Sequence, residues 1–95
     1  MTRGVDAVER ALTILGAFSA REPVLTLREL AATTELNKAT ILRIIVSLER
    51  FGYVSRLGDG RYALGPAVLQ LAGTYQRTFG LSDLVPPVLR ARIPA

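Results

Sequence analysis

Cysteine and histidine are both absent from this chain of 95 residues. Their absence excludes disulfide bonds, thiolate nucleophiles, imidazole bases and nearly every transition-metal site. Long apolar runs are also missing, and Asp6 and Glu9 lie near the N-terminus, where a signal peptide would be apolar. We therefore expect a cytoplasmic protein with no metal, no cofactor and no contact with a membrane.

The carboxylates are few and scattered, and this argues against catalysis. The eight Asp and Glu residues form no facing pair, and no glycine-rich phosphate loop follows a predicted strand. The serine and threonine hydroxyls have no general base of the usual kind. We therefore predict that the chain is not an enzyme.

Lysine is almost absent, so the positive charge comes from arginine. Twelve Lys and Arg residues against eight Asp and Glu residues give a net charge of +4, and every basic residue except Lys38 is an arginine. The guanidinium group suits phosphates and guanine edges, although a charge of this size is a weak signal by itself. The length and the 49% hydrophobic content are those of one folded domain.

A first helix is predicted over residues 5–19, and it has two adjacent apolar seams. One seam consists of Val5, Val8, Leu12 and Leu15, and the other of Ala7, Ala11, Ile14 and Phe18. Either both seams lie in the core, or one packs on the domain and the other on a partner. Pro23 lies in the segment that breaks this helix.

Two more helices with a tight turn between them are predicted next. Thr26 and Glu29 fit a capping box at the start of a short helix that ends near Thr33. Asn37 is the N-cap of the following helix, residues 38–51. That helix has an apolar face that we expect in the core, made of Ile41, Ile44, Ile45, Leu48 and Phe51.

The opposite arc of the 38–51 helix is small near its start and basic along its length. It consists of Ala39, Thr40, Arg43, Ser47 and Arg50. Small side chains allow a helix to approach base edges, and Arg43 and Arg50 are long enough to reach guanines or phosphates. This face is therefore predicted to meet DNA.

A β-hairpin is predicted after Gly52, with strands over residues 53–56 and 61–64 around Asp59-Gly60. Arg56 and Arg61 flank its tip. They either contact the DNA backbone or form a cross-strand surface pair softened by Asp59.

Tyr53 and Tyr62 lie among the apolar positions of the hairpin, so we expect them to anchor it in the core and not to stack on bases. A last helix is predicted from Gly65-Pro66 to Gly80, with an apolar stripe. The order of three helices, a hairpin and a last helix predicts a mainly α domain with a small β-hairpin, a winged helix-turn-helix, over residues 1–80.

The chain resembles the N-terminal DNA-binding domain of the IclR family of bacterial transcription regulators. The resemblance rests on residues 8–15, 27–31, 37–43, 52–54 and 62–65, in this order and spacing. It implies that the 38–51 helix is the recognition helix, with Lys38, Thr40 and Arg43 near DNA. It also implies that Arg28 and the two hairpin arginines help to hold the DNA backbone.

The resemblance further implies a homodimer on a palindromic operator in double-stranded DNA, paired through the first helix and the helix after the hairpin. A small-molecule effector would bind only to a C-terminal domain, toward which residues 81–95 would begin the linker. We expect a repressor that occludes a promoter, although activators share the fold. The alternative is a winged-helix module that dimerises or docks proteins without reading DNA.

Two positions depart from the family pattern. Glu35 stands in the turn where the family usually has glycine, so the backbone must either avoid a left-handed conformation or adopt it with strain. Ala39 stands where serine is common, which removes one hydrogen bond to DNA. Neither change alters the predicted fold.

Overall fold

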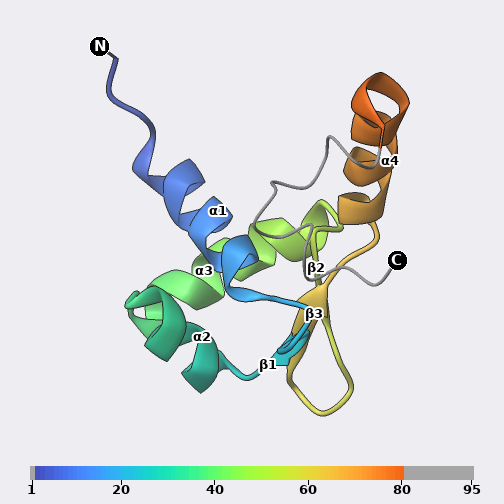
Figure 1. Ribbon diagram of the computed structural model, residues 1–95. Helices are drawn as coiled ribbons and strands as arrows, with labels where there is room; N and C mark the ends of the chain where they lie inside the picture. The colour runs from blue at the N-terminus through green and yellow to red at the C-terminus, as the bar shows by residue number, and fades with distance from the viewer. Residues whose placement is uncertain (1, 81–95) are drawn as a thin grey trace.

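The computed structural model describes residues 2–80. The elements follow the order α1 (Asp6–Ala17), β1 (Val24–Leu25), α2 (Leu27–Thr34), α3 (Lys38–Arg50), β2 (Val54–Arg56), β3 (Tyr62–Leu64) and α4 (Ala67–Phe79) (Figure 1). The predicted linker, 81–95, lies outside the described residues. Within 2–80, no helix has the length and apolar character needed to cross a membrane.

The core lies where α1, α2 and α3 meet the small sheet. Every element except α4 contributes at least one buried side chain to it, and the sheet closes one side. Its buried members are Ile14, Phe18, Leu25, Leu30, Ile41, Ile45, Leu48, Val54 and Tyr62. The apolar face predicted for α3 is thus in the core through Ile41, Ile45 and Leu48, with Ile44 packed against it.

The two seams of α1 have different surroundings. Ile14 is fully buried and Phe18 nearly so, whereas Val5, Val8 and Leu12 each expose more than half of their surface. The seam of Ile14 and Phe18 therefore packs on the domain, whereas the other seam is exposed except at Leu15, which packs against the core. Of the two alternatives left open by the sequence, the structure excludes the one in which both seams lie in the core.

The sheet has three antiparallel strands in the order β1-β3-β2. The predicted hairpin is present as β2 and β3, each one residue shorter than expected. The added strand β1 pairs Leu25 with Tyr62, and this pairing ties the hairpin to the segment just before α2. Tyr62 is buried and Tyr53 is half-buried against the core, so both tyrosines anchor the hairpin as predicted.

The junction of α3, the hairpin and α4 depends on two glycines in close contact. The Gly65 N–H donates to the Tyr53 carbonyl at 2.8 Å, and the Ala67 N–H donates to the Gly52 carbonyl at 2.9 Å. A Cβ atom on Gly65 would overlap the Gly52 carbonyl oxygen and lie 2.8 Å from the Gly52 carbonyl carbon. Only glycine fits there, because the two backbone segments leave no room for a side chain.

One apolar residue, Phe51, and the apolar stripe of α4 both lie outside the core. Phe51 was expected on the core face of α3, but it is 71% exposed. That prediction was wrong because α3 ends at Arg50, and Phe51 is the C-cap residue with ψ near 0°, already outside the regular helix. The predicted stripe of α4 forms on a helix with no buried residue, and Figure 1 shows α4 standing apart from the helical body.

Candidate nucleic-acid interface

The turn between α2 and α3 sets the direction of the candidate recognition helix. Glu35 caps α2 in the left-handed region, with φ 61°, and its N–H donates to the Ala31 carbonyl at 2.9 Å. The Thr34 hydroxyl donates to the Leu30 carbonyl at 2.7 Å and accepts from the Leu36 N–H at 3.3 Å. Of the two possibilities at Glu35, the strained left-handed one is present.

Both helices of the motif begin at the predicted caps. The Thr26 N–H donates to Glu29 Oε1 at 2.8 Å, and the Glu29 N–H donates to Thr26 Oγ1 at 3.1 Å, which completes the capping box. The Thr26 N–H, then the Thr26 hydroxyl and the Arg61 guanidinium, hold the pKa of Glu29 below its usual value. The Asn37 Oδ1 accepts from the Thr40 N–H at 2.8 Å, so Asn37 caps α3.

The outward face of α3 carries unpaired positive charge. Ala39, Arg43 and Arg50 are exposed on this face, Thr40 is half-buried at its edge, and Lys38 is exposed in the first turn of α3. Lys38, Arg43 and Arg50 make no ion pair or side-chain hydrogen bond with any residue in 2–80. Their ammonium and guanidinium donors are therefore free to meet an anionic ligand.

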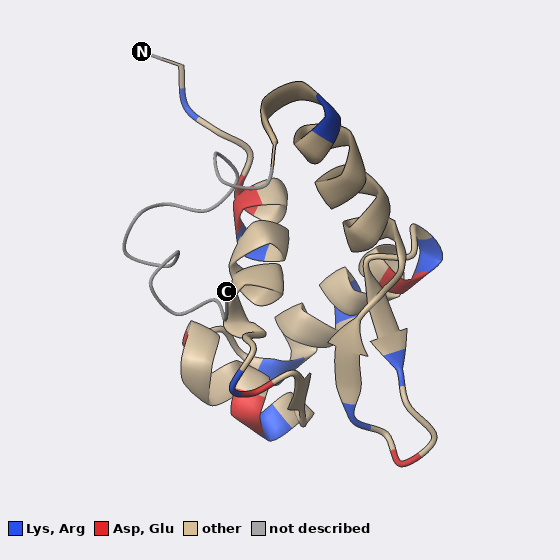
Figure 2. Ribbon diagram, turned by 45° about the vertical axis from the view of Figure 1, so that its right-hand side comes forward, with Lys and Arg blue, Asp and Glu red and all other residues tan. Residues whose placement is uncertain are grey.

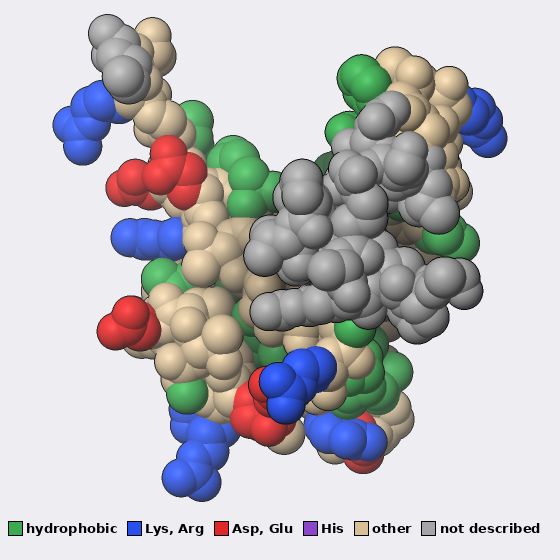
Figure 3. All heavy atoms as spheres, viewed as in Figure 1, with side chains coloured by type: hydrophobic (Ala, Val, Ile, Leu, Met, Phe, Trp, Pro, Cys, Tyr) green, Lys and Arg blue, Asp and Glu red, His purple; other side chains and the backbone are tan. Residues whose placement is uncertain are grey.

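Arg28 adds a further exposed cation, from the first turn of α2. It too lacks an ion-pair partner among the described residues. In Figure 3, basic side chains lie along the lower edge of the molecule, over α2 and the hairpin, with a few acidic side chains among them.

The two hairpin arginines are held by carboxylates within the domain. Arg56 Nη2 lies 3.3 Å from Glu49 Oε1, and its guanidinium carbon lies 5.3 Å from the centre of the Tyr62 ring. Arg61 Nε lies 2.6 Å from Asp59 Oδ2. Arg56 faces Tyr62 across the ladder, so the two arginines are not the cross-strand pair that the sequence suggested as one alternative.

The pairing at the hairpin tip is reinforced by the backbone. The Arg61 N–H donates to Asp59 Oδ1 at 3.0 Å, and together with the Arg61 side chain it holds the pKa of Asp59 below its usual value. Figure 2 shows a basic segment on each side of the hairpin and an acidic segment at its tip. The hairpin thus has much less unpaired charge than α3.

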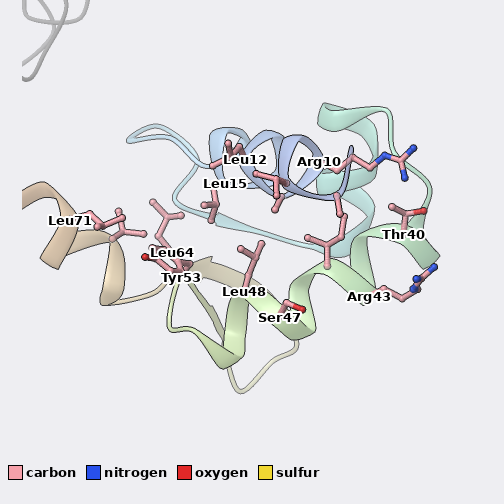
Figure 4. Close-up of a pocket in the computed structure, with 15 residues that line it drawn as sticks. Arg10, Leu12, Leu15, Thr40, Arg43, Ser47, Leu48, Tyr53, Leu64 and Leu71 are labelled. Carbon is pink, nitrogen blue, oxygen red and sulfur yellow. The ribbon is translucent and has the colours of Figure 1, made fainter. Parts of the chain in front are cut away.

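An open groove runs between α1, α3 and α4 beside this face. Its volume is about 750 Å³. Figure 4 shows that Tyr53, Leu64 and Leu71 line one end, while Thr40, Arg43 and Arg10 lie at the other. The groove is therefore apolar toward α4 and basic toward the start of α3.

Three residues of this region were not singled out from the sequence. Arg10 belongs to α1, and only the packing of α1 on α3 brings it to the same end of the groove as Arg43 (Figure 4). Leu42 and Val46 are exposed on α3, at 39% and 49%. Their helical spacing from Ala39 was readable from the sequence, but aliphatic residues next to a core face are ordinarily assigned to the core.

Comparison with known proteins agrees with this geometry. The family model of the IclR helix-turn-helix domain matches residues 7–58. The transcriptional regulator KipR of Bacillus subtilis is 30% identical over 82 residues, which cover 86% of this chain and 32% of KipR. The glycerol operon regulatory protein of Streptomyces griseus is 36% identical over 76 residues, which cover 79% of this chain and 30% of that protein.

A crystal structure of an IclR-family transcriptional regulator from Brucella abortus is similar, with a TM-score of 0.71 and 33% identity over 76% of this chain and 28% of that one. The chain thus spans about a third of the length of the relatives that it matches. These relatives are regulators of transcription, in accord with the prediction that the chain is no enzyme. With a capped helix-turn-helix, a hairpin beside it and this match, the chain belongs to the IclR family as a helix-turn-helix DNA-binding domain of its transcription regulators.

Proposed function

We propose that this domain reads a palindromic operator as a homodimer and represses transcription by occluding a promoter in the cytoplasm. The observation that carries the proposal is the outward face of α3, where Arg43 and Arg50 are exposed and, like Lys38 in the first turn of the helix, unpaired within residues 2–80. A capped helix with such a face fits the DNA major groove.

Each residue of this face has a proposed task. Lys38, Thr40 and Arg43 approach base edges, with Ala39 leaving room for the backbone of α3 to come close. Arg50, Arg28 and Arg10 neutralise phosphates and set the register of the helix on the duplex. Arg10 joins this set because it shares the basic end of the groove with Arg43 (Figure 4).

The hairpin arginines contact phosphate by giving up the carboxylates that hold them in the free domain. Arg56 and Arg61 each leave a carboxylate for a phosphate oxygen, and an exposed ion pair contributes only about 0–1 kcal/mol, so the exchange costs little. Their contribution to affinity is accordingly smaller than that of the unpaired cations on α3.

The proposed dimer uses the apolar end of the groove. Val8 and Leu12 on α1 and Leu71 on α4 are 54%, 61% and 58% exposed, and all three line the groove. Burying such surface against the same surface of a second copy is favourable and satisfies two-fold symmetry. In such a dimer the two α3 helices would need to lie about 34 Å apart, one turn of the duplex, to enter successive major grooves. Control by a small molecule is proposed to belong to another domain of a longer protein.

The proposal is tested by selecting binding sites from random-sequence duplex DNA at two salt concentrations. Enrichment of a palindrome supports specific reading by a dimer. Retention that falls with salt but enriches no sequence means contact with the backbone only. No retention at either salt favours the alternative, a winged-helix module that binds proteins.

Arg43→Ala, with Arg77→Ala as the matched control, then tests the assignment of α3. Both variants remove one exposed arginine, but Arg77 lies on α4, far along the chain from α3. A bidentate contact to guanine is worth about 1–3 kcal/mol, so Arg43→Ala should weaken operator binding by roughly 5-fold to 150-fold and relax the preference at one base pair. The control should bind within about twofold of the parent. Operator binding by Arg43→Ala equal to that of the parent would make the assignment wrong.

A further inference from the structure

An apolar strip lies beside the arginines on the outward face of α3. It consists of Ala39, Leu42 and Val46, and the two larger residues are 39% and 49% exposed. At about 100° per residue, the three side chains fall within an arc of roughly 60°, between the buried Ile45 and the exposed arginines. The spacing of three and four residues makes the strip continuous along the helix.

The strip is adjacent to the residues proposed to read bases. Arg43 and Arg50 fall within roughly 40° of Ala39 on the same wheel, on the side of the strip away from Leu42. A helix that presents these arginines to the floor of the major groove therefore presents Leu42 and Val46 to the neighbouring base edges. The apolar group that DNA offers there is the thymine 5-methyl.

We propose that Leu42 and Val46 contact thymine methyl groups, so that the operator has thymine beside the base pair read by Arg43. The inference rests on the proposed function, and it specifies one chemical feature of the operator that this domain reads. A second copy of this chain is a poor occupant for the strip, because pairing through this face would bring Arg43 and Arg50 of two molecules together. The exposed apolar surface suited to a second copy lies elsewhere, on α1 and α4.

The test replaces thymidine by deoxyuridine, which lacks only the methyl group. An operator is first selected with ordinary DNA, and each of its thymidines is then exchanged singly. At contacted positions the exchange should weaken binding about threefold to fourfold, the loss expected for one buried methyl group. At other positions it should change binding by less than about 1.5-fold, within the error of the measurement.

A cycle of base and side-chain changes identifies the partner of each methyl group. Leu42→Ala and Val46→Ala shorten exposed helical side chains and suit a helix, so both variants should fold. In the variant that has lost the contact, the penalty for deoxyuridine should disappear at one position and persist at the others. Leu69→Ala is the matched control, because Leu69 is 75% exposed on α4 and does not line the groove. It should keep the full pattern of penalties.

The outcomes separate this inference from the function on which it rests. If a palindrome is enriched and Arg43→Ala weakens its binding, but no deoxyuridine exchange matters, the operator is read without Leu42 and Val46 and the inference is overturned alone. If no sequence is enriched, the proposed function and this inference are both overturned. If Leu42→Ala or Val46→Ala leaves DNA binding intact but lowers the mass of the free protein in light scattering, the strip is a protein interface and the inference is overturned.

Discussion

Gly65→Ala should weaken the fold severely although it adds a single methyl group. That methyl group would overlap the Gly52 carbonyl oxygen and lie 3.1 Å from the Tyr53 carbonyl carbon. Overpacking of this kind costs about 1–3 kcal/mol. The shift that relieves it also stretches the hydrogen bonds Gly65 N–H to Tyr53 and Ala67 N–H to Gly52, each worth about 1 kcal/mol. The expected loss is about 2–4 kcal/mol in the free energy of unfolding.

The loss is measured by thermal and urea unfolding followed by circular dichroism, at one protein concentration because association would shift the midpoint. At about 4–8 °C per kcal/mol for a domain of this size, the melting temperature should fall by roughly 10–30 °C. Gly73→Ala is the control, because a Cβ atom there meets nothing within 4 Å inside α4. It should stabilise by about 0.5–1 kcal/mol. If the free energy of unfolding of Gly65→Ala lies within about 0.5 kcal/mol of that of the parent, the close approach of Gly65 to the Gly52 carbonyl is refuted.

Three further changes test the helix-turn-helix. Glu35→Gly should raise the free energy of unfolding by about 0.5–1 kcal/mol, because glycine relieves the left-handed strain at φ 61° but adds entropy to the unfolded chain; an unchanged urea midpoint would contradict this. Thr26→Ala should lower it by about 1 kcal/mol at pH 7. Since the folded-state pKa of Glu29 is lowered, its carboxylate stabilises the fold above the unfolded-state pKa of about 4.3, and this stabilisation is lost as the pH falls through the lower folded-state pKa. The Thr26→Ala loss is measured by urea unfolding at pH 7. Because that variant keeps the Thr26 N–H that binds the Glu29 carboxylate, the pH dependence is read from Glu29→Ala, whose difference from the parent should be smaller at pH 3 than at pH 7.

Local signals account for what the sequence predicted well. Capping boxes and N-caps join residues three apart, so Thr26, Glu29 and Asn37 could be identified without knowing the fold. The buried face of α3 follows from helical period in the same way. The strand β1 was missed because two residues show no period, and its pairing with β3 depends on atoms almost forty positions away in the chain.

The candidate site was less readable, because its charges depend on tertiary placement. The Asp59–Arg61 pair joins two residues of one turn. The sequence predicted only that Asp59 would reduce the repulsion between Arg56 and Arg61, and not that it would pair with Arg61. The Glu49–Arg56 pair forms only because the last turn of α3 lies beside β2. Arg10 reaches the groove only through the packing of α1 on α3, so periodicity within α1 does not single it out.

These placements divide the positive charge of the domain into two kinds. The cations of α3 have no partner within residues 2–80, so their full charge acts on an approaching polyanion and contributes to long-range attraction. The charges of the hairpin arginines are neutralised at long range by Glu49 and Asp59, so under the proposed function these arginines would contribute only once a phosphate is close enough to replace a carboxylate. The arrangement favours contact of α3 with DNA first and adjustment of the hairpin afterwards. Phosphate contacts carry no sequence information, so under the proposed function selectivity would come from the face of α3 on which Leu42, Arg43 and Val46 are exposed.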